Sequence, residues 1–241
     1  MEPKWKRSLL EVLWPNRCPG CNALIGPDRA VCEACGEKML LEHDAVCRRC
    51  GKVGCICDKK QLAYDRALAA CAYAEESIPA IIRMKQSENT NFAEFAARIL
   101  AERLRHGIDF GEIDLVVPVP MHPAKERQRG YNQAALIARE IASLLELPCR
   151  EDILYKEKTS RAQHELNAAE RAKNVDSFHI HDIPLDGQRI LLCDDVLTTG
   201  NTMSRCAAML KQQGAAAVIA AAAATTVPQK KTATPPKEET P

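Results

Sequence analysis

Residues 190–202 read ILLCDDVLTTGNT, an order of residue types that predicts a strand, a loop and the start of a helix. The short apolar run at its start is typical of a buried strand. The residues that follow the loop, up to Gly214, have the pattern of a helix that ends at a glycine. Asp194 and Asp195 therefore come at the carboxyl end of a strand, where open α/β sheets bind their ligands, and the loop after them leads into a helix. The stretch predicts an α/β fold with a ligand site at the carboxyl end of this strand.

The loop of residues 198–202, TTGNT, has the features of a phosphate-binding loop. It leads into a helix whose first turn offers backbone N–H groups and a partial positive charge to an anion. Gly200 lets the backbone approach the anion closely, and the hydroxyl groups of Thr198, Thr199 and Thr202 add donors. The loop lacks the lysine and the spacing of a P-loop, so we interpret it as a cradle for one phosphate group.

Asp194 and Asp195 come directly before this loop, and carboxylates do not hold phosphate but accept hydrogen bonds from hydroxyl groups. A ribose 5-phosphate carries two neighbouring hydroxyl groups and a phosphate, so it satisfies both halves of the motif. The alternative is a pair of magnesium-binding aspartates in a phosphotransfer site, which would not need the glycine-threonine loop. Cys193, beside the pair, is predicted to be a buried strand residue and not a nucleophile.

The rest of the larger part of the chain alternates between strand and helix patterns. Further strands are predicted at residues 64–74, 114–120 and 216–224, and further helices at residues 77–85, 91–105 and 132–147. Such alternation predicts a mostly parallel α/β sheet with flanking helices. Residues 155–176 carry many charges and little periodicity, so a loop or flap is predicted there.

Eight of the twelve cysteines fall between residues 18 and 57, in three C-x-x-C pairs and one C-x-C pair. They are Cys18, Cys21, Cys32, Cys35, Cys47, Cys50, Cys55 and Cys57. Eight thiolates are enough for two tetrahedral zinc sites, and cysteine ligands alone indicate closed structural sites. The simplest pairing joins the first pair with the second and the third with the fourth, and a crossed arrangement stays open. The alternatives are buried reduced thiols or redox chemistry, for which one pair would suffice.

The chain of 241 residues has room for one domain and a smaller appendage, and its net charge of +1 does not favour nucleic acid or an anionic membrane. No apolar run approaches the roughly 18–20 residues of a membrane span, and the amino end lacks the features of a signal peptide. The cytoplasm is therefore the expected location. Leu9, Leu10, Leu13 and Trp14 predict one face of a short helix. The expected parts are a cysteine-rich domain at 1–60, an α/β domain at 61–227 and a disordered tail at 228–241.

The segment at residues 116–133, VVPVPMHPAKERQRGYNQ, ends a strand and enters a helix, and arginines at such a turn suit a second anion. A solvated basic loop is the alternative. Residues 154–174 carry further basic side chains on a weakly patterned stretch, which suits a lid that closes over an anion and excludes water. The candidate residues for this second anion are Arg127, Arg129, Lys156, Lys158 and Arg161.

The stretch ILLCDDVLTTGNT resembles the 5-phosphoribosyl 1-pyrophosphate (PRPP) signature of type I phosphoribosyltransferases. The resemblance implies that Asp194 and Asp195 hold the ribose hydroxyl groups at the centre of catalysis. It implies that the 5-phosphate is held by Thr198, Thr199, Gly200, Asn201 and Thr202. Magnesium would bridge the pyrophosphate and the ribose hydroxyl groups, and the basic residues named above would neutralise the leaving pyrophosphate.

Five motifs occur in the order that is found in the ComF family, and the resemblance covers residues 5–226. They are the cysteine pairs, PVPMHPAKERQRGYNQA, TSRAQ, ERAKN and the PRPP loop. The resemblance implies a double zinc ribbon followed by a type I phosphoribosyltransferase-like domain, with structural zinc and with magnesium that accompanies PRPP. It also implies a role in natural competence, with single-stranded DNA and DNA-uptake proteins as partners.

Three functions remain open at this point. The chain is a phosphoribosyltransferase that releases pyrophosphate, a non-catalytic adaptor that binds PRPP or single-stranded DNA, or a nucleobase salvage enzyme with an added ribbon. The sequence contains no Phe, Tyr or Trp after Phe178, although enzymes that hold a purine often stack it on an aromatic side chain near the carboxyl end. This absence favours an unusual acceptor or none, unless Tyr131 or the ribbon supplies the aromatic group.

Overall fold

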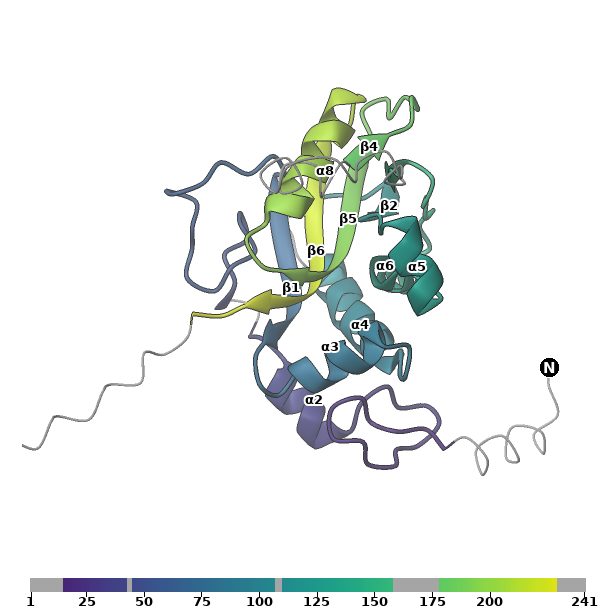
Figure 1. Cartoon of the computed structure of the whole chain (residues 1–241). Helices are drawn as coiled ribbons and strands as arrows, with labels where there is room; N and C mark the ends of the chain where they lie inside the picture. Colours follow the sequence, from purple (N-terminus) through teal and green to yellow (C-terminus); the bar gives the residue numbers. More distant parts are fainter. Residues whose placement is uncertain (1–14, 43–44, 107–109, 158–177, 229–241) are drawn as a thin grey trace, which may run out of the picture.

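The computed structural model describes residues 15–42, 45–106, 110–157 and 178–228. Figure 1 shows strands β1, β6, β5 and β2 side by side, with helices packed around them. The elements in chain order are α2 (Glu33–Met39), β1 (Arg66–Tyr73), α3 (Ile78–Lys85), α4 (Asn91–His106), β2 (Leu115–Pro118), α5 (Pro123–Arg129), α6 (Gln133–Leu145), β3 (Leu154–Lys156), β4 (Phe178–Ile180), β5 (Arg189–Leu197), α8 (Asn201–Gln212) and β6 (Ala217–Thr226).

Within the described residues, β1, β6, β5 and β2 form one sheet in that order, and every neighbouring pair is parallel. This confirms the predicted α/β sheet. Strand β6 lies inside the sheet, and its residues 218–225 are all buried. The sequence signal for β6 was weak because alanine, which forms most of it, has little intrinsic preference for strands.

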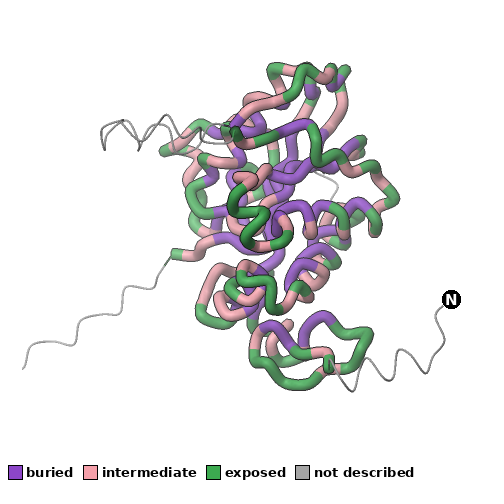
Figure 2. Tube along the Cα trace, turned by 45° about the vertical axis from the view of Figure 1, so that its right-hand side comes forward, coloured by how far each residue is buried: buried purple, intermediate pink, exposed green. Residues whose placement is uncertain are grey.

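The sheet is covered on both faces, which is why its strands consist of continuous apolar runs. Ile219 and Ala221 of β6 belong to the core beneath α3, α4 and α6, whereas Val218 and Ala220 belong to the core beneath α8. This alternation follows from the two-residue period of a strand. Figure 2 shows that the buried parts of the trace are concentrated in the interior, while the loops are mostly exposed.

The structure corrects two local predictions. The basic turn before Gly130 is a short helix, α5, which Pro123 starts because its fixed backbone angle suits a first helical position. Gly130 ends this helix in the left-handed conformation, with φ of 82°. The predicted flap begins with strand β3, which pairs antiparallel with β4. The pairing was missed because the partner strand is more than twenty residues away, so no local period reveals it.

The cysteine-rich segment packs against the sheet domain at both of its ends. Near the first four cysteines, Arg83 on α3 donates a hydrogen bond to the carbonyl oxygen of Gly20 at 2.8 Å. Near the last four, Tyr64 donates to the carbonyl oxygen of Cys50 at 3.0 Å, and Cys50 itself belongs to the core under α8. The segment is therefore packed against the sheet domain near both groups of cysteines.

Three predictions fall wholly or mostly on residues outside the described ones. These are the amino-terminal helix face of residues 9–14, the flap from residue 158 onward and the carboxyl-terminal tail from residue 229. Among the helices that the structure describes, none combines the length and apolar character needed to cross a membrane.

Candidate functional site

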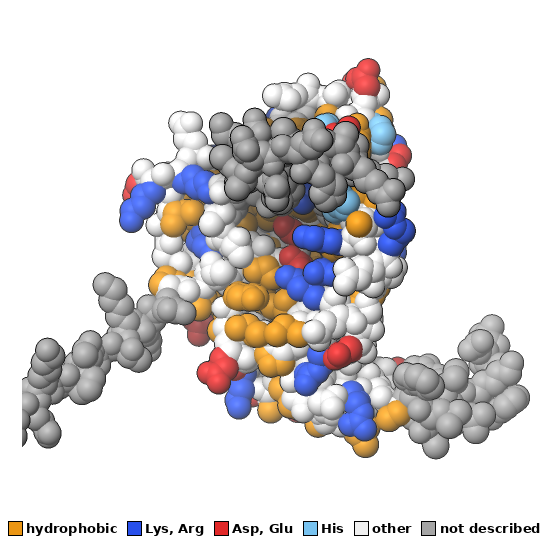
Figure 3. Space-filling view, viewed as in Figure 1, with side chains coloured by type: hydrophobic (Ala, Val, Ile, Leu, Met, Phe, Trp, Pro, Cys, Tyr) orange, Lys and Arg blue, Asp and Glu red, His pale blue; other side chains and the backbone are white. Residues whose placement is uncertain are grey.

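The acidic pair lies on β5 at the carboxyl edge of the sheet. Asp194 is paired in register with Ala222 of β6, and the strand continues past Asp195 to Leu197. On the other side, the backbone N–H of Val119, just after β2, donates to the carbonyl oxygen of Cys193 at 2.8 Å. On the face shown in Figure 3, acidic side chains lie beside basic ones in a hollow near the middle of the molecule. The two carboxylates thus stand where parallel sheets bind ligands.

A lysine that the sequence motifs did not indicate is paired with this acidic site. Lys85, the last residue of α3, places Nζ 2.9 Å from Oδ2 of Asp195. Asp194 instead accepts the backbone N–H of Asp195 at 2.8 Å. Burial, and then the charge of Asp195, raise the pKa of Asp194 to about 8. The site therefore holds two crowded carboxylates, of which one is balanced by a cation and the other resists ionisation.

Replacing Asp194 with asparagine is expected to stabilise the ligand-free protein, with a larger gain near pH 8 than near pH 4. The raised pKa of Asp194 means that the folded protein keeps a proton which the unfolded chain releases above its own pKa of about 3.9. The free energy of unfolding therefore falls as the pH rises between these two values, and asparagine removes this loss. Thermal unfolding of both proteins across this pH range tests the prediction, and identical pH profiles would contradict it.

The loop at residues 198–202 has the backbone of an anion site. Gly200 adopts φ of 74°, which a residue with a side chain rarely tolerates, and α8 begins at the next residue. A Cβ at Gly200 would lie 2.8 Å from the hydroxyl oxygen of Tyr64, so the back of the loop has no room for a side chain. Because the first N–H groups of a helix have no acceptor within it, the start of α8 offers donors to an anion.

The basic residues near the site fall into separate groups. An open groove runs beside Lys85, and its lining residues are Ile82, Lys85, Gln86, Lys125, Gln128 and Arg129. Arg129 also donates to Oε1 of Gln133 at 3.0 Å, which holds its guanidinium in place. Arg127 is exposed and is not among the lining residues. The groove, next to the acidic pair, has room and positive charge for a second anion.

The remaining candidates for the second anion lie on or beyond β3. Lys156 lies over the ring of Phe178, with Nζ 4.2 Å from the ring centre, so its ammonium group makes a cation–π contact with the neighbouring strand β4. Lys158 and Arg161, and the TSRAQ and ERAKN motifs, lie outside the described residues.

Three other side chains have local roles in the structure. The Nδ1 atom of His122 accepts the backbone N–H of Ala124 at 3.1 Å, so this histidine caps α5. Tyr131 donates its hydroxyl group to the carbonyl oxygen of Met84 at 2.6 Å. Cys193 is fully buried in β5, and burial raises its pKa well above that of an ordinary thiol. The prediction that Cys193 is a packed strand residue is confirmed.

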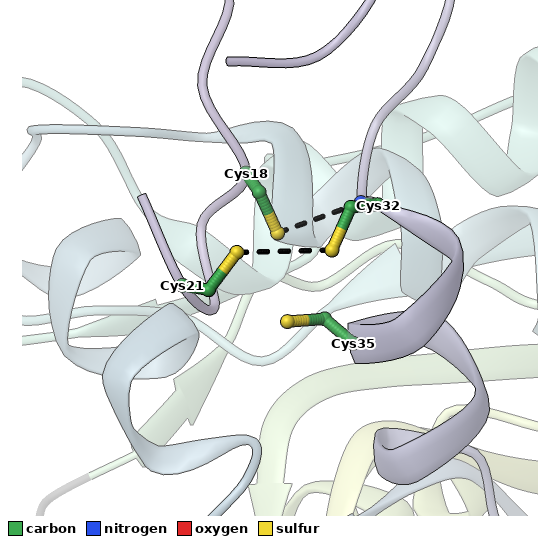
Figure 4. Close-up of side chains that lie close together, drawn as sticks. All are labelled: Cys18, Cys21, Cys32 and Cys35. Carbon is green, nitrogen blue, oxygen red and sulfur yellow. Dashed lines mark hydrogen bonds between the residues drawn. The ribbon is translucent and has the colours of Figure 1, made fainter. Parts of the chain in front are cut away.

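The eight clustered cysteines form two groups of four with the sequential pairing. The first group, drawn in Figure 4, is Cys18, Cys21, Cys32 and Cys35, and the second is Cys47, Cys50, Cys55 and Cys57. Sulfur atoms bound to one tetrahedral zinc ion at about 2.3 Å lie about 3.8 Å apart. The corresponding distances are 3.7 Å for Cys21–Cys32, 3.9 Å for Cys47–Cys57 and 4.0 Å for Cys50–Cys55. Both groups fit structural zinc.

The pKa values of these thiols show why a cation suits them. Burial and then the thiol groups around it raise the pKa of Cys35 to about 12. At Cys18 burial also opposes ionisation, but backbone N–H groups outweigh it and lower the pKa to about 7. Four thiols packed this closely cannot all ionise on their own, and a divalent cation relieves the repulsion between their thiolates.

Comparison with known families gives two matches, one for each half of the motif pattern. Residues 9–72 match the family model described as a double zinc ribbon domain. Residues 87–240, more than half of the chain, match the model described as a phosphoribosyl transferase domain. Of solved structures, the purine phosphoribosyltransferase from Pyrococcus horikoshii is similar with 18% identity and a TM-score of 0.37, over 57% of this chain and 83% of that one.

Relatives with similar sequences cover most of the chain. The DNA utilization protein YhgH of Escherichia coli K12 is 26% identical over 196 residues, which are 80% of this chain and 83% of that protein. Competence protein F of Haemophilus influenzae is 27% identical over 211 residues, or 85% and 88%. Competence protein ComFC of Bacillus subtilis is 25% identical over 200 residues, or 78% and 80%.

Proposed function

The chain belongs to the ComF family, in which a double zinc ribbon precedes a phosphoribosyl transferase domain, and from this premise we propose that it binds PRPP. Asp194 and Asp195 hold the ribose hydroxyl groups, and residues 198–202 hold the 5-phosphate. The observation that carries this proposal is the order of groups along β5 and α8. Two half-buried carboxylates are followed at once by a left-handed glycine and a helix amino terminus.

The basic groove beside Lys85 is proposed to take the pyrophosphate of PRPP. It lies next to the acidic pair, because Lys85 lines the groove and also contacts Asp195. Lys125 and Arg129, four residues apart on α5, face the groove together. Of the two predicted arginines on α5, Arg129 is the better placed, since Arg127 is not part of the lining.

If the bound PRPP reacts, an acceptor displaces pyrophosphate from C1 of the ribose through a transition state with positive charge on the ring. Magnesium, when bound with PRPP, would neutralise pyrophosphate oxygens, and the carboxylate oxygens at the end of β5 are donors of the type it takes. The chain's own residues supply the rest. Asp194 and Asp195 fix the ribose through its hydroxyl groups, and Lys85 and Arg129 stabilise the charge that develops on the leaving pyrophosphate.

The cellular role is proposed to be DNA utilization or natural competence, as the names of the related proteins indicate. A non-catalytic adaptor that binds PRPP or single-stranded DNA for the DNA-uptake machinery is the second candidate. The absence of aromatic residues after Phe178 favours it, and the hydroxyl group of Tyr131 is bonded to the backbone of α3. A salvage enzyme for one nucleobase is the third candidate.

Pyrophosphate release separates these candidates. The protein is incubated with PRPP, magnesium and a panel of nucleobases and nucleotides, and a calorimetric titration measures PRPP affinity in parallel. We expect saturable binding of PRPP. Release that depends on one nucleobase would establish the salvage enzyme, and release with another acceptor would establish a different transferase. Binding without turnover across the panel would support the adaptor, and no PRPP binding would overturn the proposed function.

A further inference from the structure

A lysine from the cysteine-rich segment lies on the proposed phosphate loop. Lys60 donates hydrogen bonds from Nζ to the carbonyl oxygen of Thr199, at 2.8 Å, and to Oδ1 of Asn201. Thr199 is the second residue of the loop and Asn201 is the first residue of α8. The ammonium group therefore lies against the turn that enters the helix, although Lys60 is 139 residues from Thr199 in the sequence.

The second group of four cysteines sets the position of Lys60. Cys57, the last cysteine of this group, comes three residues earlier, and the backbone N–H of Lys59 donates to the carbonyl oxygen of Ile56 at 3.0 Å. On the other side, the backbone N–H of Ala63 donates to Oγ of Ser204 in the first turn of α8, at 2.9 Å. Lys60 is thus held between a cysteine group and the helix that carries the phosphate loop.

The same segment also packs against the loop at residues 198–202, through Tyr64. Tyr64 is fully buried, and its hydroxyl group bonds to Cys50 while it packs against the backbone of Gly200. Gly51, with φ of 72°, lies so close to β5 that a Cβ would stand 2.5 Å from Cδ2 of Leu197. The second cysteine group and the phosphate loop are therefore packed as one unit.

We propose that Lys60 is a binding residue for the 5-phosphate and that the second cysteine group holds it in place, an inference that rests on the proposed PRPP function. Residues 198–202 contain no basic side chain, so the loop itself offers a phosphate only N–H and hydroxyl donors. The neutral oxygens of Thr199 and Asn201 are the partners that the structure gives Lys60. Neither of these partners is a carboxylate, so in these two contacts no acidic group neutralises the ammonium beside the loop, and Lys60 would supply the cation that a P-loop carries within its own motif.

The test compares Lys60→Gln with Lys59→Gln, which removes the same charge from the exposed neighbouring residue. Calorimetry measures the affinity of each protein for PRPP, ribose 5-phosphate and magnesium pyrophosphate. Lys60→Gln is expected to weaken PRPP and ribose 5-phosphate by about 10- to 100-fold, the usual effect of a lost hydrogen bond to a charged group. Pyrophosphate binding should not change. Lys59→Gln should bind all three as the wild type does, and Lys60→Arg should retain most of the affinity.

Each result decides between the two proposals. If the wild type binds PRPP and Lys60→Gln binds it equally well, the proposed role of Lys60 is overturned and the proposed function stands. An equal loss for pyrophosphate would also overturn it, because the effect would not be specific to the 5-phosphate. If the wild type does not bind PRPP, both proposals fail. If Lys60 acts through its charge, the loss of PRPP affinity in Lys60→Gln should shrink as the ionic strength rises. A loss of affinity that does not depend on salt would show that Lys60 only stabilises the conformation of the loop. Zinc content of two ions per chain in every variant confirms that the ribbon is intact.

Discussion

The double variant Asp194→Asn/Asp195→Asn is expected to lose PRPP binding, with a fall in affinity of more than about 100-fold. Each hydrogen bond between a charged group and a hydroxyl group is worth about 1.5–3 kcal/mol, and the variant weakens at least two of them. It also frees Lys85 from the partner that now positions its ammonium group. A calorimetric titration with PRPP and magnesium measures the loss.

A matched control is available elsewhere on the surface. Glu151 and Asp152 are also adjacent carboxylates in ion pairs, with Arg139 and Arg150, and both are exposed. Glu151→Gln/Asp152→Asn removes the same charge and should leave PRPP affinity unchanged. The site variant should unfold at the wild-type temperature or above it, because it no longer carries the buried charge, or the repulsion from Asp195, that raise the pKa of Asp194. Wild-type affinity in a folded Asp194→Asn/Asp195→Asn variant would overturn the site assignment.

The two cysteine groups are expected to differ in their effect on ligand binding. Cys55→Ser removes one exposed ligand from the second group, and Cys21→Ser removes one exposed ligand from the first. Each variant should lose about one zinc ion per chain, because a structural site needs its four ligands. Only Cys55→Ser should weaken PRPP binding, by about as much as Lys60→Gln. The reason is that the second group, and not the first, is followed by the residues that contact the proposed phosphate loop and α8.

Zinc analysis, PRPP titration and thermal unfolding of the two variants together test this prediction. The first group also contacts the sheet domain, at α3. The hydrogen bond there, from Arg83 to the carbonyl oxygen of Gly20, does not involve the loop at residues 198–202. Equal PRPP affinities for Cys55→Ser and Cys21→Ser would contradict the proposed coupling. So would a loss of affinity in Cys21→Ser with a zinc-loaded second group.

Much of the architecture could be predicted from sequence because it is written in local patterns. The strand at residues 189–193, the helix that ends before Gly214 and the eight paired cysteines depend on residue types at short spacings. The short helix α5 and the pairing of β3 with β4 were not predicted, for different reasons. The helix has only seven residues, too few for a clear period, and the two strands lie far apart in the chain.

The type of fold, the clustered cysteines and the motif on β5 with its proposed phosphate loop could be predicted from the sequence, because each is a property of neighbouring residues. Which cations lie beside that motif depends on the tertiary structure. Lys85 arrives from α3 and Lys60 from the cysteine-rich segment, and nothing in the residues around either lysine points to the loop. The loop has no lysine among its own residues. Folding brings one to it, since a charge acts through distance in space and not along the chain.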